Sequence, residues 1–289
     1  YLMDQGYNIG ILENDFGAVN VDMMLLRELE GEQCELEMVA GGCDKDCHRR
    51  RFKTKLIAMG MCGYDRVLIE PSGIFDMDEF FDALHEEPLD RWYQIGNVIA
   101  VVDAGLDEKM SEEADYILAS EVADAGCIVL SKTQEASEKS IKSTVKHLNR
   151  ALEAVHCKRK FGEDEIIRKD WEQFETEDFE RILNSGYIAE DYEKMSLDEK
   201  EVFKSLYFMD LEISGEELRD AAQKIMQDPA CGSVFRIKGF TQEPDGSWTE
   251  LNATHHEITQ CPIAEGQKVI IVIGEQPNEE MIKKYFGTD

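Results

Sequence analysis

The sequence has 289 residues, of which 61 are acidic and 31 are basic, and its formal net charge is −30. This excess of acid argues against binding to nucleic acid or to an anionic membrane surface, because both require clustered cations. A hydrophobic content of 43% is enough for packed cores, and the length predicts two domains.

The eight cysteines favour a reducing compartment. Cys43 and Cys47 lie close together in the sequence, whereas the others are scattered and several fall in apolar runs. No apolar stretch approaches the roughly 20 residues that span a bilayer, and no signal peptide precedes the first expected strand. We therefore expect a cytoplasmic protein.

Residues 1–154 alternate short apolar runs with helical stretches. Strands are expected at 7–14, 66–73, 97–105 and 126–133, and helices at 49–62, 76–86, 111–125 and 135–154. Such short, continuous runs are typical of parallel strands buried on both faces. The predicted fold is α/β, with a doubly wound, mostly parallel sheet whose ligands bind beyond the carboxyl ends of the strands.

The rest of the chain predicts a connector and a smaller domain. Residues 155–203 are rich in charge and indicate a helical connector with a short strand near 155–161. Residues 204–289 predict an α+β domain, with strands at 205–213, 233–241, 248–259 and 268–275 and helices at 214–228 and 278–286. Its sheet is expected to be covered on one side.

Two local signals in this smaller domain are specific. Ser214 followed by Glu217 is a capping-box signature, and the segment Pro244-Asp245-Gly246 predicts a turn. His255 and His256 fall within an expected strand, so their side chains should point to opposite faces and form no joint site.

The run RVLIEPSG at 66–73 delivers an acidic residue and then a glycine at the end of a strand. Glu70 would lie near a magnesium ion, and Gly73 would let a backbone N–H approach a phosphate. The alternative is an ordinary exit from a strand into a loop.

The segment ILENDFGAVNVD at 11–22 repeats this arrangement. Loops of this kind respond to a γ-phosphate through a magnesium ion. Glu13, Asp15 and Asp22 would equally suit direct metal binding, and the plain alternative is an acidic loop.

The segment GGCDKDCHRRRF at 41–52 places Cys43, Cys47 and His48 near the start of a helix. Thiolate and imidazole suit zinc, cobalt or nickel. The segment supplies two or three ligands, and an incomplete shell suits transfer better than a closed structural site. Two unconnected thiols in a surface loop are the alternative.

The fourth feature is CIVLSKTQE at 127–135, in which a strand ends in Ser131-Lys132. A lysine at this position can pack its stem over a purine base. The alternative is a strand end followed by a helix cap.

In this order and spacing, ILENDFGAVNVD, GGCDKDC, LIEPSG, VIAVVDA and VLSKTQ resemble the CobW-like family of metallochaperone GTPases. SVFRIKGF and KVIIVIGE resemble the start and end of the CobW C-terminal domain, so the likeness covers most of the chain. The resemblance implies a P-loop GTPase-like nucleotide-binding domain at 1–154, a connector at 155–203 and a C-terminal domain at 204–289.

The resemblance also implies roles for single residues. Asn14, Asp15 and Gly17 would form the first switch, and Glu70 and Gly73 the second. Glu70 and Asp15 would serve catalysis. Base binding would fall to Ser131, Lys132 and Gln134, and metal binding to Cys43 and Cys47, assisted by Glu13 and His48.

Three departures from the family are visible. The family's phosphate loop, G-x-x-x-x-G-K-[ST], does not occur in the 289 residues, so we expect an N-terminally truncated chain that binds nucleotide poorly, and leave hydrolysis open. The metal motif Gly-Cys-x-Cys-Cys appears with one thiol fewer and wider spacing. The family's Asn-Lys-x-Asp appears with Gln134 in the last position, which predicts relaxed guanine specificity.

The function implied is GTP-dependent delivery of zinc, cobalt or nickel to a client metalloprotein, with Mg²⁺ beside the nucleotide and slow hydrolysis. Two alternatives stay open: a non-hydrolysing scaffold that binds nucleotide or metal, and an activator of a corrinoid or other cofactor enzyme. Neither nucleic acid nor membrane is an expected partner, and the sequence does not define the oligomeric state.

Overall fold

The computed structural model describes residues 1–15, 23, 26–40, 45–71, 77–162, 165–190, 192–193, 203–264 and 266–287. The chain forms two compact units, Tyr1–Ser196 and Leu197–Asp289. Among the described helices, none is both long and apolar enough to cross a membrane.

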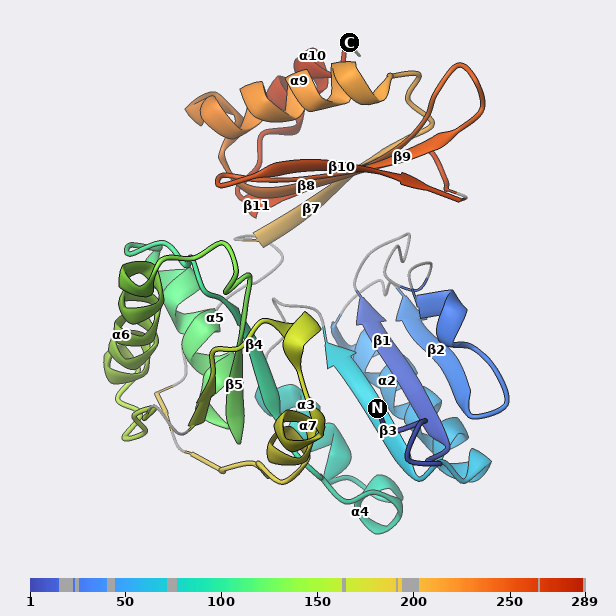
Figure 1. Cartoon of the computed structure of the whole chain (residues 1–289), viewed down its shortest axis with the longest axis vertical. Helices are drawn as coiled ribbons and strands as arrows, with labels where there is room; N and C mark the ends of the chain where they lie inside the picture. The colour runs from blue at the N-terminus through green and yellow to red at the C-terminus, as the bar shows by residue number, and fades with distance from the viewer. Residues whose placement is uncertain are drawn as a thin grey trace. The chain divides into compact units, whose positions relative to one another are not determined.

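The first unit contains two three-stranded parallel sheets, which confirms the predicted α/β class. One sheet has the order β2-β1-β3, from β1 (Ile9–Asp15), β2 (Cys34–Ala40) and β3 (Arg66–Pro71). The other has the order β4-β5-β6, from β4 (Ile99–Asp103), β5 (Cys127–Ser131) and β6 (Ile166–Ile167). The parallel strands thus fall into two groups (Figure 1).

Helices cover the first sheet because β1 is apolar on both faces. α2 (Lys45–Cys62), α3 (Met77–Leu84) and α4 (Leu89–Trp92) contribute to one core around Leu12, Phe52 and Leu56. Gly10 permits the close packing of α2, since a Cβ at this position would lie 2.6 Å from the side chain of Met59. On the other face, Ile9, Ile11, Cys34 and Leu36 form a smaller cluster.

α5 (Glu112–Ala123) and α6 (Glu138–Ala154) pack together beside the second sheet (Figure 1). Both begin with a serine whose hydroxyl accepts an N–H bond, Ser111 from Ala114 and Ser137 from Ser140. Buried His147 joins them, because its Nε2 lies 2.6 Å from Oδ1 of Asp115. This contact fixes the orientation of α6.

The segment predicted as a connector contains β6, a 3₁₀ turn (Trp171–Gln173) and α7 (Thr176–Leu183). The expected strand near 155–161 is wrong: the strand is Ile166–Ile167, which pairs with Ile128 and Val129 of β5. Both isoleucines are buried, whereas 155–161 alternates buried and exposed residues without pairing in the described sheets.

The second unit is an antiparallel sheet in the order β10-β9-β8-β11-β7. Its strands are β7 (Phe203–Met209), β8 (Ser233–Gln242), β9 (Trp248–Thr254), β10 (Ile258–Ile263) and β11 (Val269–Glu275). α9 (Gly215–Gln227) and α10 (Glu279–Tyr285) lie on one face, as expected from the sequence (Figure 1). The capping box of Ser214 and Glu217 is present.

The single strand predicted over 248–259 is wrong, because β9 ends at Thr254 and β10 begins at Ile258. The hydroxyl of Thr254 accepts hydrogen bonds from the N–H groups of His256 and Glu257, which closes a tight turn. His255 and His256 are therefore exposed in a hairpin turn rather than placed on a strand.

Candidate functional site

The strands of the β2-β1-β3 sheet end together at its carboxyl edge, where three of the predicted motifs meet. Glu13 is in register with Glu70 of β3, and Asp15 with Ala40 of β2. Register partners on parallel strands direct their side chains to the same face. Glu13 and Glu70 are therefore brought together, with Glu13 only 4% exposed and Glu70 exposed.

Cys47 and His48 reach this edge from another layer. β2 ends at Ala40 and α2 begins at Lys45, so both residues lie in the first turn of α2. Cys47 is half-buried, and His48 is 1% exposed. α2 packs on the face that carries Leu12, opposite the face shared by Ile11 and Glu13. The structure thus places the sulfur donor and the carboxylates at one edge but in different layers.

Ion pairs hold α2 in position. Lys55 Nζ lies 2.6 Å from Glu37 Oε2 on β2, and Lys53 Nζ lies 2.6 Å from Glu86 Oε2 after α3. The hydrogen bond from Lys53 lowers the pKa of Glu86, and Arg49 adds to this effect from 2.6 Å. These contacts hold α2 against β2 and against the segment that follows α3.

The second predicted cluster lies at the carboxyl edge of β4 and β5. Asp103 is in register with Ser131, and Lys132 follows with a left-handed φ of 55°. Lys132 Nζ donates to Asp103 Oδ2 at 2.7 Å, while the N–H of Gly105 donates to Asp103 Oδ1 at 2.7 Å. Ser131 is half-buried and Gln134 is exposed. Asp103 therefore ties the loop after β5 to the loop after β4.

Four predicted site residues lie outside the described residues, namely Gly17, Asp22, Cys43 and Gly73. The side chains of Asn14 and Asp15 are not described, although their backbone belongs to β1. Within the described part of the chain, no group of three or more His, Cys, Asp or Glu residues is arranged to hold a metal ion.

Comparison with known proteins identifies the first unit. The profile described as CobW/HypB/UreG, nucleotide-binding domain, matches residues 1–161. The chain belongs to this family. The CobW/HypB/UreG match contains both carboxyl-edge clusters, since they span Glu13 to Gln134.

A curated relative from Escherichia coli (strain K12), the zinc chaperone YjiA, is 30% identical over 141 residues, which is 46% of this chain. The alignment spans 43% of the relative, less than half of its length. Two solved structures are also similar. One is the Zn(II)-bound YjiA GTPase from E. coli, with 17% identity, a TM-score of 0.36 and coverage of 96% of this chain and 97% of that one. The other is a Zn(II)-bound triple mutant of YjiA GTPase, with 18% identity, a TM-score of 0.37 and coverage of 98% and 90%.

Proposed function

We propose that the chain is a GTP-dependent metallochaperone that delivers zinc, cobalt or nickel to a client protein. The observation that carries the proposal is the shared carboxyl edge of β1, β2 and β3. At this edge lie the acidic end of β1 and Glu70 of β3. The start of α2, which carries Cys47, lies at the same edge. Membership of the CobW/HypB/UreG family supports this assignment, as does the partial match to a zinc chaperone.

The metal is the cargo in this proposal. Cys43 and Cys47 would bind it as thiolates, with His48 completing part of the shell, whereas Glu13 lies in a different layer from Cys47. Sulfur and nitrogen ligands favour zinc, cobalt and nickel over magnesium or calcium. A shell with few protein ligands releases its metal more readily than a closed tetrahedral site, which suits transfer to a client.

The nucleotide would be held at both carboxyl edges. Asn14, Gly17 and Gly73 would contact the phosphates, with Asp15 and Glu70 beside the Mg²⁺ ion, which supplies charge neutralisation when bound. Ser131, Lys132 and Gln134 would contact the base. The bond from Lys132 to Asp103 fits this role, because it holds the lysine loop at the tip of β4.

Gln134 gives this proposal a specific consequence. A glutamine amide offers one acceptor and one donor, whereas the two N–H groups on the edge of guanine require acceptors. Discrimination between GTP and ATP is therefore expected to be weaker than with an aspartate at this position, and Gln134→Asp should raise it.

The decisive measurement is metal stoichiometry in the paired variant Cys43→Ser with Cys47→Ser. Zinc titration against a chromophoric competitor should show loss of the tightest site in this variant. The matched control is Cys62→Ser with Cys261→Ser, which removes two exposed thiols and should leave that site unchanged. Equal stoichiometry in the two variants contradicts the proposal.

A second candidate is a scaffold that binds nucleotide without hydrolysing it, and Gln134 favours it. GTP and ATP titrations, followed by phosphate release, separate the two functions. Binding without release under any metal or client condition supports the scaffold.

A further inference from the structure

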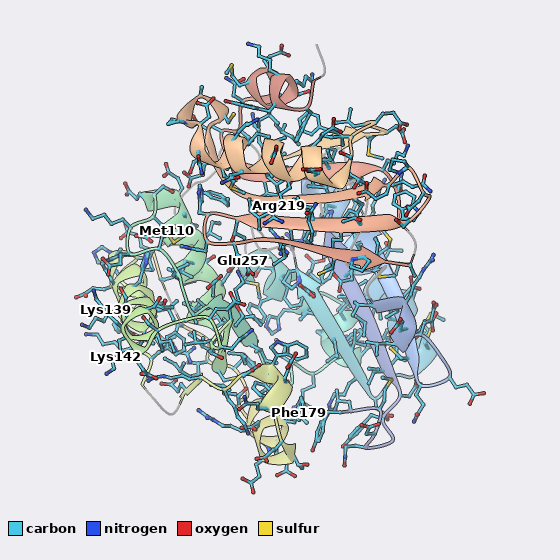
Figure 2. All side chains as sticks on the ribbon, turned by 45° about the horizontal axis from the view of Figure 1, so that its top comes forward. Met110, Lys139, Lys142, Phe179, Arg219 and Glu257 are labelled. Carbon is cyan, nitrogen blue, oxygen red and sulfur yellow. The ribbon has the colours of Figure 1, made fainter. Side chains whose placement is uncertain are left out.

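We infer that the outer face of α6 is a docking surface for an acidic segment of a partner protein. This face borders a groove of about 570 Å³ that carries five cations: Lys109, Lys139, Lys142, Lys146 and Arg150. All five side chains are exposed. Figure 2 shows Lys139 and Lys142 projecting from α6 into solvent. This concentration of positive charge occurs in a chain whose net charge is −30.

The lysines that line this groove lack the carboxylate partners that many other lysines of the described chain have. Lys53, Lys55, Lys132, Lys169, Lys268 and Lys283 each contact a carboxylate within 4 Å. Lys109, Lys139, Lys142 and Lys146 make no ion pair with any carboxylate in the described ranges. Their charges are therefore available to an external anion.

The two carboxylates in the groove, Glu108 and Glu138, offset only part of this charge, because five cations line the same groove. Glu108 accepts a hydrogen bond from the Ser143 hydroxyl at 3.1 Å, and its backbone oxygen accepts one from Arg150 at 2.7 Å. Glu138 lies in the first turn of α6, where the helix dipole stabilises a negative charge. Glu108 thus builds the wall of the groove and holds Arg150 in place.

The spacing of the cations selects a short partner segment. Lys139, Lys142, Lys146 and Arg150 follow one side of α6 at intervals of three and four residues, a length of about 16 Å. A partner helix with acidic residues at the same intervals matches this repeat. A long polyanion such as duplex DNA would extend beyond the groove onto the rest of the chain. In the whole chain, acidic residues outnumber basic residues two to one.

This inference does not depend on metal or nucleotide binding, because none of these residues belongs to either carboxyl-edge cluster. The test is fluorescence anisotropy with a labelled helical peptide of about 16 residues that carries glutamate at i, i+4 spacing. The variant is Lys139→Glu, Lys142→Glu and Lys146→Glu combined. The control is Lys204→Glu, Lys224→Glu and Lys284→Glu combined, which makes the same charge change at exposed positions on the other unit.

We expect the α6 variant to weaken peptide binding by roughly tenfold or more at low salt, and the control to weaken it less than threefold. Replacing the three lysines by arginine should retain binding, because the charge is kept. A glutamine version of the peptide should bind weakly. Circular dichroism confirms that each variant is folded.

Four results would overturn the inference. One is equal loss in the α6 variant and the control, and another is equal binding of the glutamine peptide. Tighter binding of a DNA duplex or of anionic vesicles, abolished by the α6 variant, would identify a different class of partner. Self-association of the chain that the α6 variant removes would identify a second copy as the occupant.

Discussion

The central strand β11 of the second unit and the outer strands β3 and β4 of the first unit differ in how far their side chains are buried. In the second unit, β11 lies between β8 and β7, and Val272 and Ile270 are at most 1% exposed. In the first unit, β3 and β4 are outer strands of the described sheets, and Leu68, Ile99 and Val101 are 43%, 43% and 70% exposed.

This difference in exposure arises from where a strand lies in its sheet and not from which residues it contains. The strands of both units are rich in β-branched and aliphatic residues, and the central strands β1, β5 and β11 bury nearly all of them, whereas the outer strands β3 and β4 leave several exposed. Burial of an aliphatic side chain contributes about 1.5–3 kcal/mol, so equal residues at buried positions and on the exposed outer strands should contribute unequally to stability. The following predictions test this inequality, from the largest effect to the smallest.

Leu218→Ala should be the most damaging change. Leu218 is fully buried in α9, and its Cδ2 lies 2.4 Å from the position of a Cβ built on Gly239. We expect a loss of about 2–5 kcal/mol, against less than about 1 kcal/mol for Leu68→Ala in β3. Hydrogen exchange across β8 and β11, measured in the whole chain, reports the loss in the second unit. Similar costs for the two leucines would contradict the comparison.

Glu121 of the first unit should change stability with pH in the opposite direction to Asp228 and Glu217 of the second unit. Burial raises the pKa of Glu121 in α5 to about 8, so the folded chain holds a proton that the unfolded chain releases near pH 4.5. Stability of the first unit should therefore fall as pH rises from about 5 to 8, by at most about 1.4 kcal/mol per pH unit. Glu121→Gln should flatten this slope in urea denaturation.

Asp228 and Glu217 of the second unit behave in the reverse way to Glu121, as Glu86 does in the first unit. Hydrogen bonds from Tyr285 and from the N–H of Ala230 lower the pKa of Asp228, and bonds from Ser214 lower that of Glu217. Their contribution is present above the unfolded pKa values and is lost as pH falls below about 4. Hydrogen exchange, resolved by unit, measures both effects. The assignment is refuted if stability changes with pH in the same direction below about pH 4 as it does between about pH 5 and 8.

The smallest effect is expected for Val101→Thr. At 70% exposure, the added hydroxyl stays in water, and stability should change by no more than about 0.5 kcal/mol. The same substitution at fully buried Val272 leaves a hydroxyl to be satisfied in the core, and should cost about 1–3 kcal/mol. Denaturation curves of this matched pair give the comparison without a change in side-chain size.

The sequence predicted most of the strands and missed β2, β6 and β10. β2 was not predicted, because its sequence CELEMVA alternates apolar residues with Glu35 and Glu37. Glu37 is held by Lys55 and Glu35 by Tyr64, partners on other elements that no local pattern reveals. β10 was not predicted as a strand of its own, because Pro262 is unfavourable inside a strand. β10 is an outer strand of the described sheet, where a missing N–H is tolerated.

The candidate site was predictable as a set of strand ends and no further. Parallel strands bring Glu13 and Glu70 to one edge, as expected from the motifs. The link between Asp103 and Lys132 was not predicted, because it depends on the register between β4 and β5. The separation of Cys47 and Glu13 into different layers likewise follows from which face of β1 meets α2.

The exposed side chains of β3 and β4 have a consequence for handling the protein. Outer strands that carry Leu68, Ile99 and Val101 can pair with strands of other copies and start aggregation. With a net charge of −30, copies repel one another, and that repulsion is screened beyond about 8 Å at physiological ionic strength. Concentrated stocks should therefore stay clear at low salt and become turbid as salt is raised.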